Sequence, residues 1–171
     1  MAGDTGEARI VRVAAARLTA EAWAPFGALP VDETDPADPV RIEFEWGDPH
    51  VNYISHRADE VERSQRGLRC DRMYRHDTHT QTLMPLNCDS VLAVAPAEVD
   101  FSDPSHLTSI RAFMLRPLDC FVLARGTWHW GPFPTGPEPV RLLNLQGRRY
   151  AEDNASVDLT PVTGATVEIA L

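Results

Sequence analysis

The sequence predicts a mainly β protein, a sandwich or closed barrel with one or two short helices. From residue 68 onward, short apolar stretches recur at even spacing, separated by Pro, Gly, Asp or Asn. Residues 40–46, VRIEFEW, alternate without a fault between apolar and charged side chains, which is typical of a half-buried strand. Helix signals are confined to short stretches, so we expect a helix content below about 20%, against the usual third.

The N-terminal region is expected to contain a strand, a short helix and a loop. Residues 8–18 are a candidate first strand. Residues 19–27 follow as a short helix, with Thr19 as the N-cap and Pro25 near the end. Residues 30–39 are acidic and rich in proline, which indicates a loop.

The strand at 40–46 is expected to pair with residues 50–55 as a β-hairpin across the turn GDP. Residues 58–67 are charged and indicate a surface helical turn or loop. A single helical turn is expected to start near Pro104. The remaining candidate strands are residues 68–76, 81–86, 90–96, 109–115, 119–125, 128–133, 140–146 and 165–171.

Composition limits the classes of function. The 171 residues predict one domain over residues 1–171. The formal net charge is −9 and no basic cluster is visible, so we expect neither nucleic acid nor a membrane as a partner. All 16 basic residues are arginines, so the chain has no lysine for a Schiff base or for pyridoxal phosphate (PLP). A small-molecule substrate is the expected partner.

No apolar run approaches the roughly 18 residues that a membrane helix needs. The N-terminus lacks a basic-then-apolar signal pattern, so we expect a cytoplasmic protein. The cysteines, which are Cys70, Cys88 and Cys120, are widely spaced and have no zinc-finger pattern. We expect free thiols in a reducing compartment.

Polar side chains gather in RMYRHDTHTQTLMP, residues 72–85. On a strand, Arg72, Tyr74 and His76 share one face, and Gln81 starts the next strand after a loop. If that face lines a barrel, the phenol, the imidazole and the amide meet in its lumen. Arg72 is a candidate anchor for a carboxylate, although pairing with an acidic residue at the barrel rim is slightly favoured.

A second group of polar and aromatic residues lies in LARGTWHWGPF, residues 123–133. A turn is expected before Trp128, His129 and Trp130. If the strand is regular, His129 faces opposite to both tryptophans, and a bulge would relax that conflict. We expect His129 to join His76 and Gln81 in one polar cluster inside an apolar barrel.

The spacing of these two groups resembles the cupin motifs. The first group reads Tyr74-x-His76-x4-Gln81, and the second contains Gly126-x-x-His129. Within the cupins, the chain resembles the ureidoglycolate lyase family over about residues 17–160. The segments that carry this resemblance are LTAEAWAPFG, YRHDTHTQTLMP, IRAF and ARGTWHWGP.

The resemblance implies a cupin-like β-barrel or double-stranded β-helix, a homodimer, and a C–N lyase of purine catabolism that splits ureidoglycolate into glyoxylate and urea. It implies the catalytic residues His76, His129, Tyr74 and Gln81. It also implies a divalent metal site, or none, with the candidate ligands His76, His129 and Gln81. Imidazole ligands would suit nickel, zinc, iron or manganese. The substrate-binding candidates are Arg72, Asn52, Met84, Trp128 and Trp130.

The chain departs from the family pattern at four polar positions. Tyr74 replaces a Glu, Ala124 and Trp130 each replace a His, and Asn52 and Tyr53 lie where the family has an Arg. These changes lower the charge of the expected pocket. An enzyme that acts on a less ionic or more aromatic substrate as a biosynthetic lyase, isomerase or cyclase, and a non-catalytic cupin that binds a small ligand, are therefore alternatives.

The other histidines carry weaker expectations. His79 lies in the loop after His76 and is expected to be exposed to solvent rather than functional. His50, His56 and His106 have no partner pattern, so surface or structural roles are expected.

Overall fold

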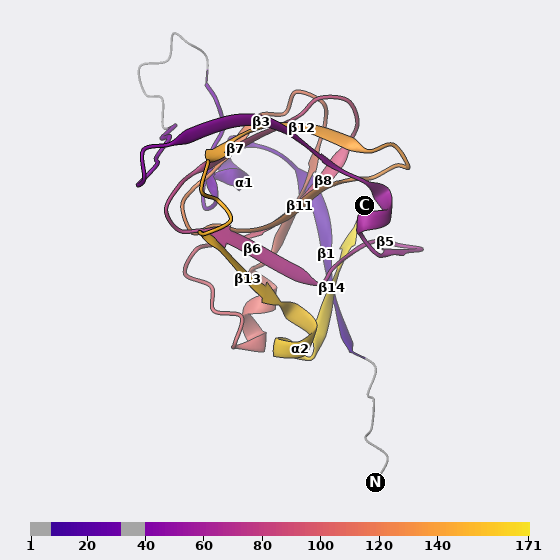
Figure 1. Cartoon of the computed structure of the whole chain (residues 1–171). Coiled ribbons are helices and arrows are strands. Elements are labelled where there is room, and N and C mark those ends of the chain that lie inside the picture. Colours follow the sequence, from indigo (N-terminus) through magenta and orange to yellow (C-terminus); the bar gives the residue numbers. More distant parts are fainter. Residues whose placement is uncertain (1–7, 32–39) are drawn as a thin grey trace.

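The computed structural model describes residues 8–31 and 40–171, whose strands form two curled sheets (Figure 1). The first sheet contains, in order, β13 (Asn154–Asp158), β6 (Arg72–His76), β11 (Trp128–Pro134), β8 (Ser90–Ala95), β9 (Arg111–Leu115), β1 (Arg9–Arg17), β14 (Ala165–Ala170), β5 (Gly67–Cys70) and β4 (Arg63–Ser64). The second contains β2 (Gly27–Ala28), β10 (Phe121–Leu123), β7 (Gln81–Pro85), β12 (Val140–Gly147) and β3 (Pro49–His56).

The helices are short, as predicted. They are α1 (Ala20–Trp23), α2 (Leu159–Thr163) and the 3-10 helices η1 (Ala58–Glu60) and η2 (Pro104–Ser109). Thr19 caps α1, because its Oγ1 accepts a hydrogen bond from the main-chain N–H of Ala22 at 3.2 Å. The mainly β prediction is therefore confirmed. No helix in residues 8–31 and 40–171 is long and apolar enough to cross a membrane.

The predicted strand at 40–46 is wrong. This segment forms only an isolated bridge between Phe44 and His79, and β3 pairs with β12 instead of with residues 40–46. Ile42 and Trp46 are 45% and 37% exposed, so the alternation does not bury an apolar face. The alternating pattern identified an extended backbone, but it could not identify what that backbone lies against.

Other predicted elements differ in their bounds or were missed. The single strand expected at 68–76 is two strands, β5 and β6, which pair with different neighbours. The edge strand β13 and the helix α2 were not predicted, because the alternation in NASVD has only Ala155 and Val157 as apolar positions and LTPVT is a single short turn. Part of the loop expected at 30–39, residues 32–39, lies outside the described residues.

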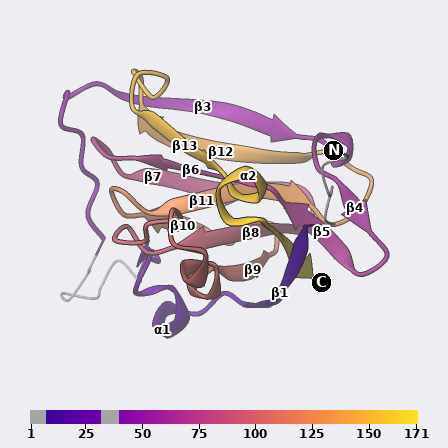
Figure 2. The ribbon, with the colours of Figure 1, turned by 90° about the horizontal axis from the view of Figure 1, so that it is seen from below.

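Two apolar clusters lie on opposite faces of the first sheet, and β8 shows the alternation clearly. Val91, Ala93 and Ala95 face one cluster, which α2 and η2 cover, and Leu92 and Val94 face the other. The second cluster fills one end of the space between the sheets, where α1 contributes Trp23 and β10 contributes Phe121. Figure 2 shows β3 and β12 along one side of the fold and β8, β9 and β1 toward the other.

The inner face of β12 changes from apolar to polar along its length. Val140 and Leu142 belong to the second apolar cluster, and Asn144 and Gln146 continue the same face. Strand β7 shows the same change. Leu83 packs in that cluster, and Gln81, two residues earlier, lies on the same face at the polar end. One end of the space between the sheets is therefore packed, and the other end is a polar cavity.

Candidate functional site

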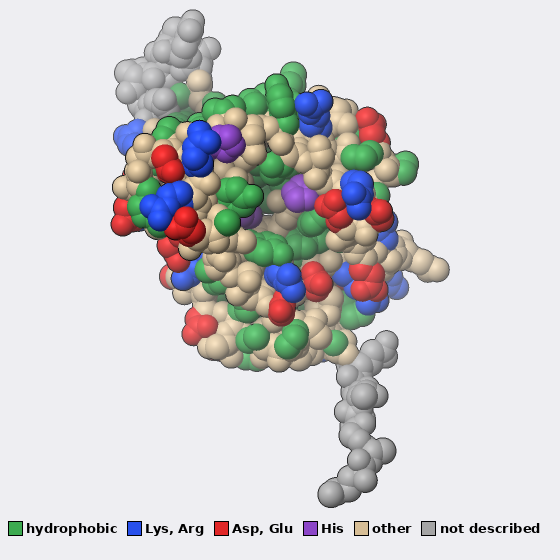
Figure 3. All heavy atoms as spheres, in the orientation of Figure 1, with side chains coloured by type: hydrophobic (Ala, Val, Ile, Leu, Met, Phe, Trp, Pro, Cys, Tyr) green, Lys and Arg blue, Asp and Glu red, His purple; other side chains and the backbone are tan. Residues whose placement is uncertain are grey.

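The polar end of the fold contains a cavity of about 510 Å³ between the two sheets. Figure 3 shows histidine side chains inside a hollow in the centre of this face. The lining residues include five of the predicted site residues, namely Asn52, Tyr74, His76, Gln81 and His129. The other lining residues are Ile54, His56, Glu60, Leu83, Gly131, Phe133, Gln146, Tyr150 and Asn154.

One wall of the cavity comes from the neighbouring strands β6 and β11. His129 lies opposite Tyr74 in the antiparallel pairing of these strands, and the rings of His129 and His76 have centroids 5.3 Å apart. The main-chain N–H of Gly126 donates to the carbonyl of His76 at 2.7 Å, which ties the turn before β11 to the end of β6. We call Tyr74, His76 and His129 the imidazole wall.

Both histidines of this wall are neutral at physiological pH. Nδ1 of His129 lies 3.1 Å from the carbonyl of Thr127, and Nδ1 of His76 lies 3.3 Å from the carbonyl of Asp153. Because a carbonyl only accepts, each Nδ1 carries the proton and each Nε2 keeps its lone pair. Burial, followed by the neighbouring imidazoles, lowers the pKa of His76 to about 4 and that of His129 to about 3.

The opposite wall consists of side-chain amides from the second sheet. Nε2 of Gln81 donates to Oδ1 of Asn144 at 2.9 Å and to Oε1 of Gln146 at 3.0 Å. Nδ2 of Asn144 in turn donates to Oδ1 of Asn52 at 2.7 Å. Oε1 of Gln81 is buried and has no hydrogen-bond partner within the described parts of the chain. We call these four residues the amide wall.

The expectation that His79 is exposed is wrong, because only 2% of this residue is accessible. Its ring stacks on His76 with a centroid distance of 4.6 Å, and on Phe44 at 6.3 Å. Its Nδ1 lies 3.2 Å from Oδ2 of Asp153. The loop that seemed exposed in the sequence is covered by residues 43–46, since Thr80 donates to the carbonyl of Glu43 at 3.0 Å.

Asp153 holds this loop in place. Its carboxylate accepts the main-chain N–H groups of Asp77 at 3.0 Å and Thr78 at 2.8 Å, and the hydroxyl of Thr78 at 2.6 Å. Burial raises the pKa of Asp153, but these hydrogen bonds from Thr78 and Asp77, together with His79, outweigh it and leave the pKa lowered. The carboxylate is therefore ionised at neutral pH, and the pKa of His79 is lowered chiefly by burial.

Two groups of residues could hold a metal ion. His76, His129 and Gln81 supply two imidazoles and one unpartnered amide oxygen to the cavity. His76, His79 and Asp153 form a second group, in which one ligand atom from each residue lies within 4.8 Å of the others. A divalent ion in either place would act as a Lewis acid on a substrate oxygen.

The structure does not bring the other four predicted site residues to the cavity. Trp128 and Trp130 belong to the first apolar cluster, because the strand is regular through Trp130 and the bulge comes after it. Met84 lies three residues after Gln81 on β7, so its side chain points to the opposite, outer face of the strand. Arg72 is exposed and binds Asp158, and its Nη1 donates to the hydroxyl of Tyr74 at 3.3 Å.

Several residues that line the cavity or hydrogen-bond to its surroundings were missed by the sequence analysis. Asn144 and Gln146 carried a usable signal, because they continue the alternation of an otherwise apolar strand. Tyr150, Asp153 and Asn154 follow that strand and carried no pattern. His56, expected to be structural or on the surface, lies at the cavity rim with Nδ1 3.2 Å from Oε2 of Glu60.

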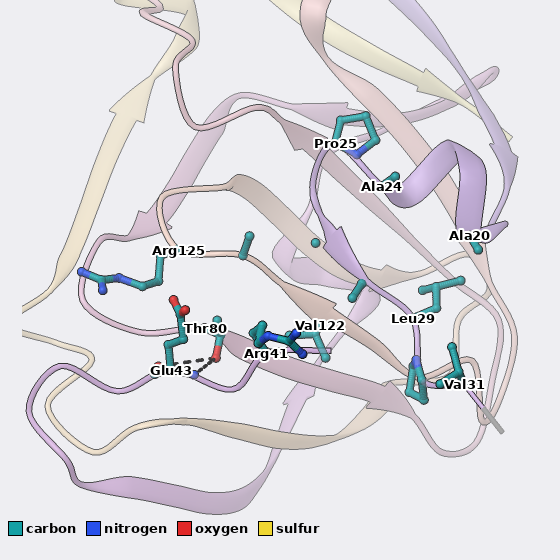
Figure 4. A pocket seen from close by; sticks show the side chains of 14 residues that line it. Ala20, Ala24, Pro25, Leu29, Val31, Arg41, Glu43, Thr80, Val122 and Arg125 are labelled. Carbon is teal, nitrogen blue, oxygen red and sulfur yellow. Dashed lines mark hydrogen bonds between the residues drawn. The ribbon is translucent and has the colours of Figure 1, made fainter. Parts of the chain in front are cut away.

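A second cavity, of about 590 Å³, lies beside the segment that follows α1 (Figure 4). Small and apolar side chains make up most of its lining, and Arg41, Glu43, Thr80 and Arg125 supply its polar groups. In Figure 4 the hydrogen bond from the main-chain N–H of Glu43 to Oγ1 of Thr80 crosses one edge of the cavity. Its lining, as far as the described residues show it, includes no imidazole, so the cavity between the two walls is the better candidate for proton transfer.

The fold and the cavity agree with a comparison against protein families. A family model described as ureidoglycolate lyase matches residues 36–161, which include both walls. No curated protein matches the chain significantly. The curled sheets with short helices are consistent with a cupin, as the resemblance implied. The chain belongs to the ureidoglycolate lyase family.

Proposed function

We propose that the protein is a C–N lyase that releases urea from ureidoglycolate. The observation that carries this proposal is the pair of opposed walls around one cavity. One wall offers neutral imidazoles and a phenol for proton transfer, and the other offers amides. Ureidoglycolate presents a hydroxyl group, which must lose a proton, and an amide-like ureido group, which must be held.

The amide wall suits a ureido group. Oε1 of Gln81 is a buried acceptor without a partner, and a ureido N–H group is a donor of matching polarity. Leaving such an acceptor unsatisfied costs about 1–3 kcal/mol, so a ligand that donates to it gains binding energy. Gln81 and the neighbouring Gln146 both line the cavity, so their positions would orient the leaving nitrogen.

The proposed reaction is an elimination across the carbinol carbon. Nε2 of His129 accepts the hydroxyl proton, the C=O bond of glyoxylate forms, and the C–N bond breaks with its electron pair moving to the urea nitrogen. The Tyr74 hydroxyl, opposite His129 across the strand pairing, protonates that nitrogen. Arg72 donates to the Tyr74 oxygen and stabilises the negative charge left there. Proton transfer from His129 to Tyr74 then restores both groups.

A second candidate function is a lyase that acts on an uncharged relative of ureidoglycolate. Among the described residues, the cavity lining includes Glu60 and no arginine or lysine, although ureidoglycolate carries a carboxylate. A substrate with an amide or ester in place of that carboxylate would avoid an unpaired negative charge in the cavity.

Turnover of ureidoglycolate and of its amide and methyl ester tests both candidates. The enzyme, as purified and after addition of divalent metal ions, is expected to release urea from at least one of these compounds. Release from ureidoglycolate supports the first candidate, and release only from the uncharged analogues supports the second. Well-folded protein that turns over none of the three would contradict both.

A further inference from the structure

We propose that His76, His79 and Asp153 bind a divalent transition-metal ion beside the cavity, which His76 lines. This site differs from the set implied by the family resemblance, because it uses the loop histidine His79 and a carboxylate in place of His129 and the amide of Gln81. The inference does not depend on the proposed reaction.

The spacing of the three side chains fits a shared ion. Two ligand atoms at about 2.1 Å from one ion lie about 3.0–3.4 Å apart at octahedral or tetrahedral angles. Nδ1 of His79 and Oδ2 of Asp153 are 3.2 Å apart, and one ligand atom from each of the three residues lies within 4.8 Å of the others. Two imidazoles and one carboxylate form a common ligand set for first-row divalent ions.

The environment holds these ligands as metal ligands are usually held. Metal-binding carboxylates are generally hydrogen-bonded, and Oδ1 of Asp153 accepts the main-chain N–H of Asp77 while Oδ2 accepts that of Thr78. The ring of His79 is fixed between Phe44 and His76.

Gly147 leaves room for this ring. A Cβ atom at Gly147 would lie 2.9 Å from Nδ1 and 3.1 Å from Cγ of His79, which is closer than real contacts of this kind. The close approach of the β12 backbone to this ring therefore depends on the glycine.

An ion at this place would lie next to the substrate cavity. Its ligand His76 lines the cavity, and so does Asn154, the residue after Asp153. It would supply the positive charge that the lining side chains lack. A carboxylate or carbonyl oxygen of a bound molecule is then the group that such an ion would attract.

Metal titration of chelator-treated protein with Co²⁺, followed by visible absorption and calorimetry, tests the proposal without any assay of activity. Wild-type protein is expected to bind one equivalent of Co²⁺. His79→Gln is expected to weaken binding by more than about 100-fold, beyond the effect of losing an outer-shell partner. His129→Gln and His106→Gln, which remove imidazoles outside the group, are expected to keep wild-type affinity.

Two glycine variants test the site without replacing a ligand, in case the His79 variant does not fold. Gly147→Ala crowds His79 and is expected to weaken Co²⁺ binding, whereas Gly136→Ala meets nothing within 4 Å and is expected to leave it unchanged. The proposal is overturned if wild-type protein binds no Co²⁺. It is also overturned if binding survives in both His79→Gln and Gly147→Ala, or if His129→Gln abolishes binding while His79→Gln retains it.

Discussion

The rings of His76 and His129 lie 5.3 Å apart at an interplanar angle of 45°, although they come from strands far apart in the sequence. Strand β6 carries one and strand β11 the other, and the two strands pair directly at Tyr74 and His129. The proton of each ring is held by a main-chain carbonyl, so both Nε2 atoms are available as acceptors. Proton transfer by His129 and by Tyr74, which lies opposite it, is the basis of the proposed reaction.

Replacing either imidazole is expected to reduce turnover with little loss of folding. For His129→Gln we expect kcat to fall by about 10²–10⁴-fold, the usual contribution of a general base. For His76→Gln we expect a similar loss. Steady-state kinetics on the accepted substrate, beside circular dichroism, measures both effects.

His106→Gln is the matched control, because His106 lies on η2 and outside the cavity lining. Its kinetics are expected to equal those of the wild type. Full activity in both His76→Gln and His129→Gln would remove these residues from the reaction.

The buried imidazoles are expected to make folding stability depend on pH below neutrality. The pKa of His129 falls from 6.5 to about 3 on folding, so the unfolded chain takes up a proton first as the pH drops. Its stabilising contribution is complete above pH 6.5 and is lost progressively toward about pH 3. The largest slope is about 1.4 kcal/mol per pH unit for each such group.

Urea unfolding of wild type and His129→Gln between pH 7 and pH 4 isolates this contribution from that of the carboxylates. The free energy of unfolding of the variant is expected to fall less steeply with decreasing pH. Parallel pH profiles of the two proteins would contradict the burial of a neutral His129.

Gln81→Met is expected to raise KM more than it lowers kcat. The thioether keeps the length of the side chain, but it removes the donor to Asn144 and Gln146 and the unpartnered Oε1. The loss of a buried partner costs about 1–3 kcal/mol, which corresponds to about 5- to 150-fold in KM. An unchanged KM would show that the substrate does not contact the amide wall.

Gly147→Ala is expected to destabilise the protein by about 1–3 kcal/mol, the usual cost of overpacking a well-packed site. The added Cβ would lie 2.9 Å from Nδ1 of His79, so the ring must shift from its present place beside Asp153. Thermal unfolding of Gly147→Ala, compared with that of Gly136→Ala, measures the effect. Equal melting temperatures would show that the ring can move aside without loss of stability.

The strands that carry the site could be predicted from sequence because their signals are local. Tyr74, His76 and Gln81 were placed correctly by alternation within β6 and at the start of β7. The same alternation places Trp128 and Trp130 opposite His129, and the expectation that they bind substrate required a bulge that the strand makes only after Trp130.

The parts that could not be predicted depend on contacts between distant segments. From the sequence, His79 is a residue of a polar loop. In the structure, residues 43–46 cover that loop, and Asp153, which follows β12, contacts His79. Residues 40–46 have a strand pattern, but they lie against the loop at 78–80 through the Phe44–His79 bridge and do not pair with β3. Local periodicity contains no information about such pairings.

The central claim, an elimination that releases urea intact between the imidazole and amide walls, is tested most directly by product analysis. Complete turnover of the accepted substrate is expected to give urea and the aldehyde product, which is glyoxylate for ureidoglycolate, in equal amounts and without ammonia. His129→Gln should form both products about 10²–10⁴-fold more slowly. Release of ammonia in place of urea would indicate hydrolysis of the ureido group and contradict the elimination.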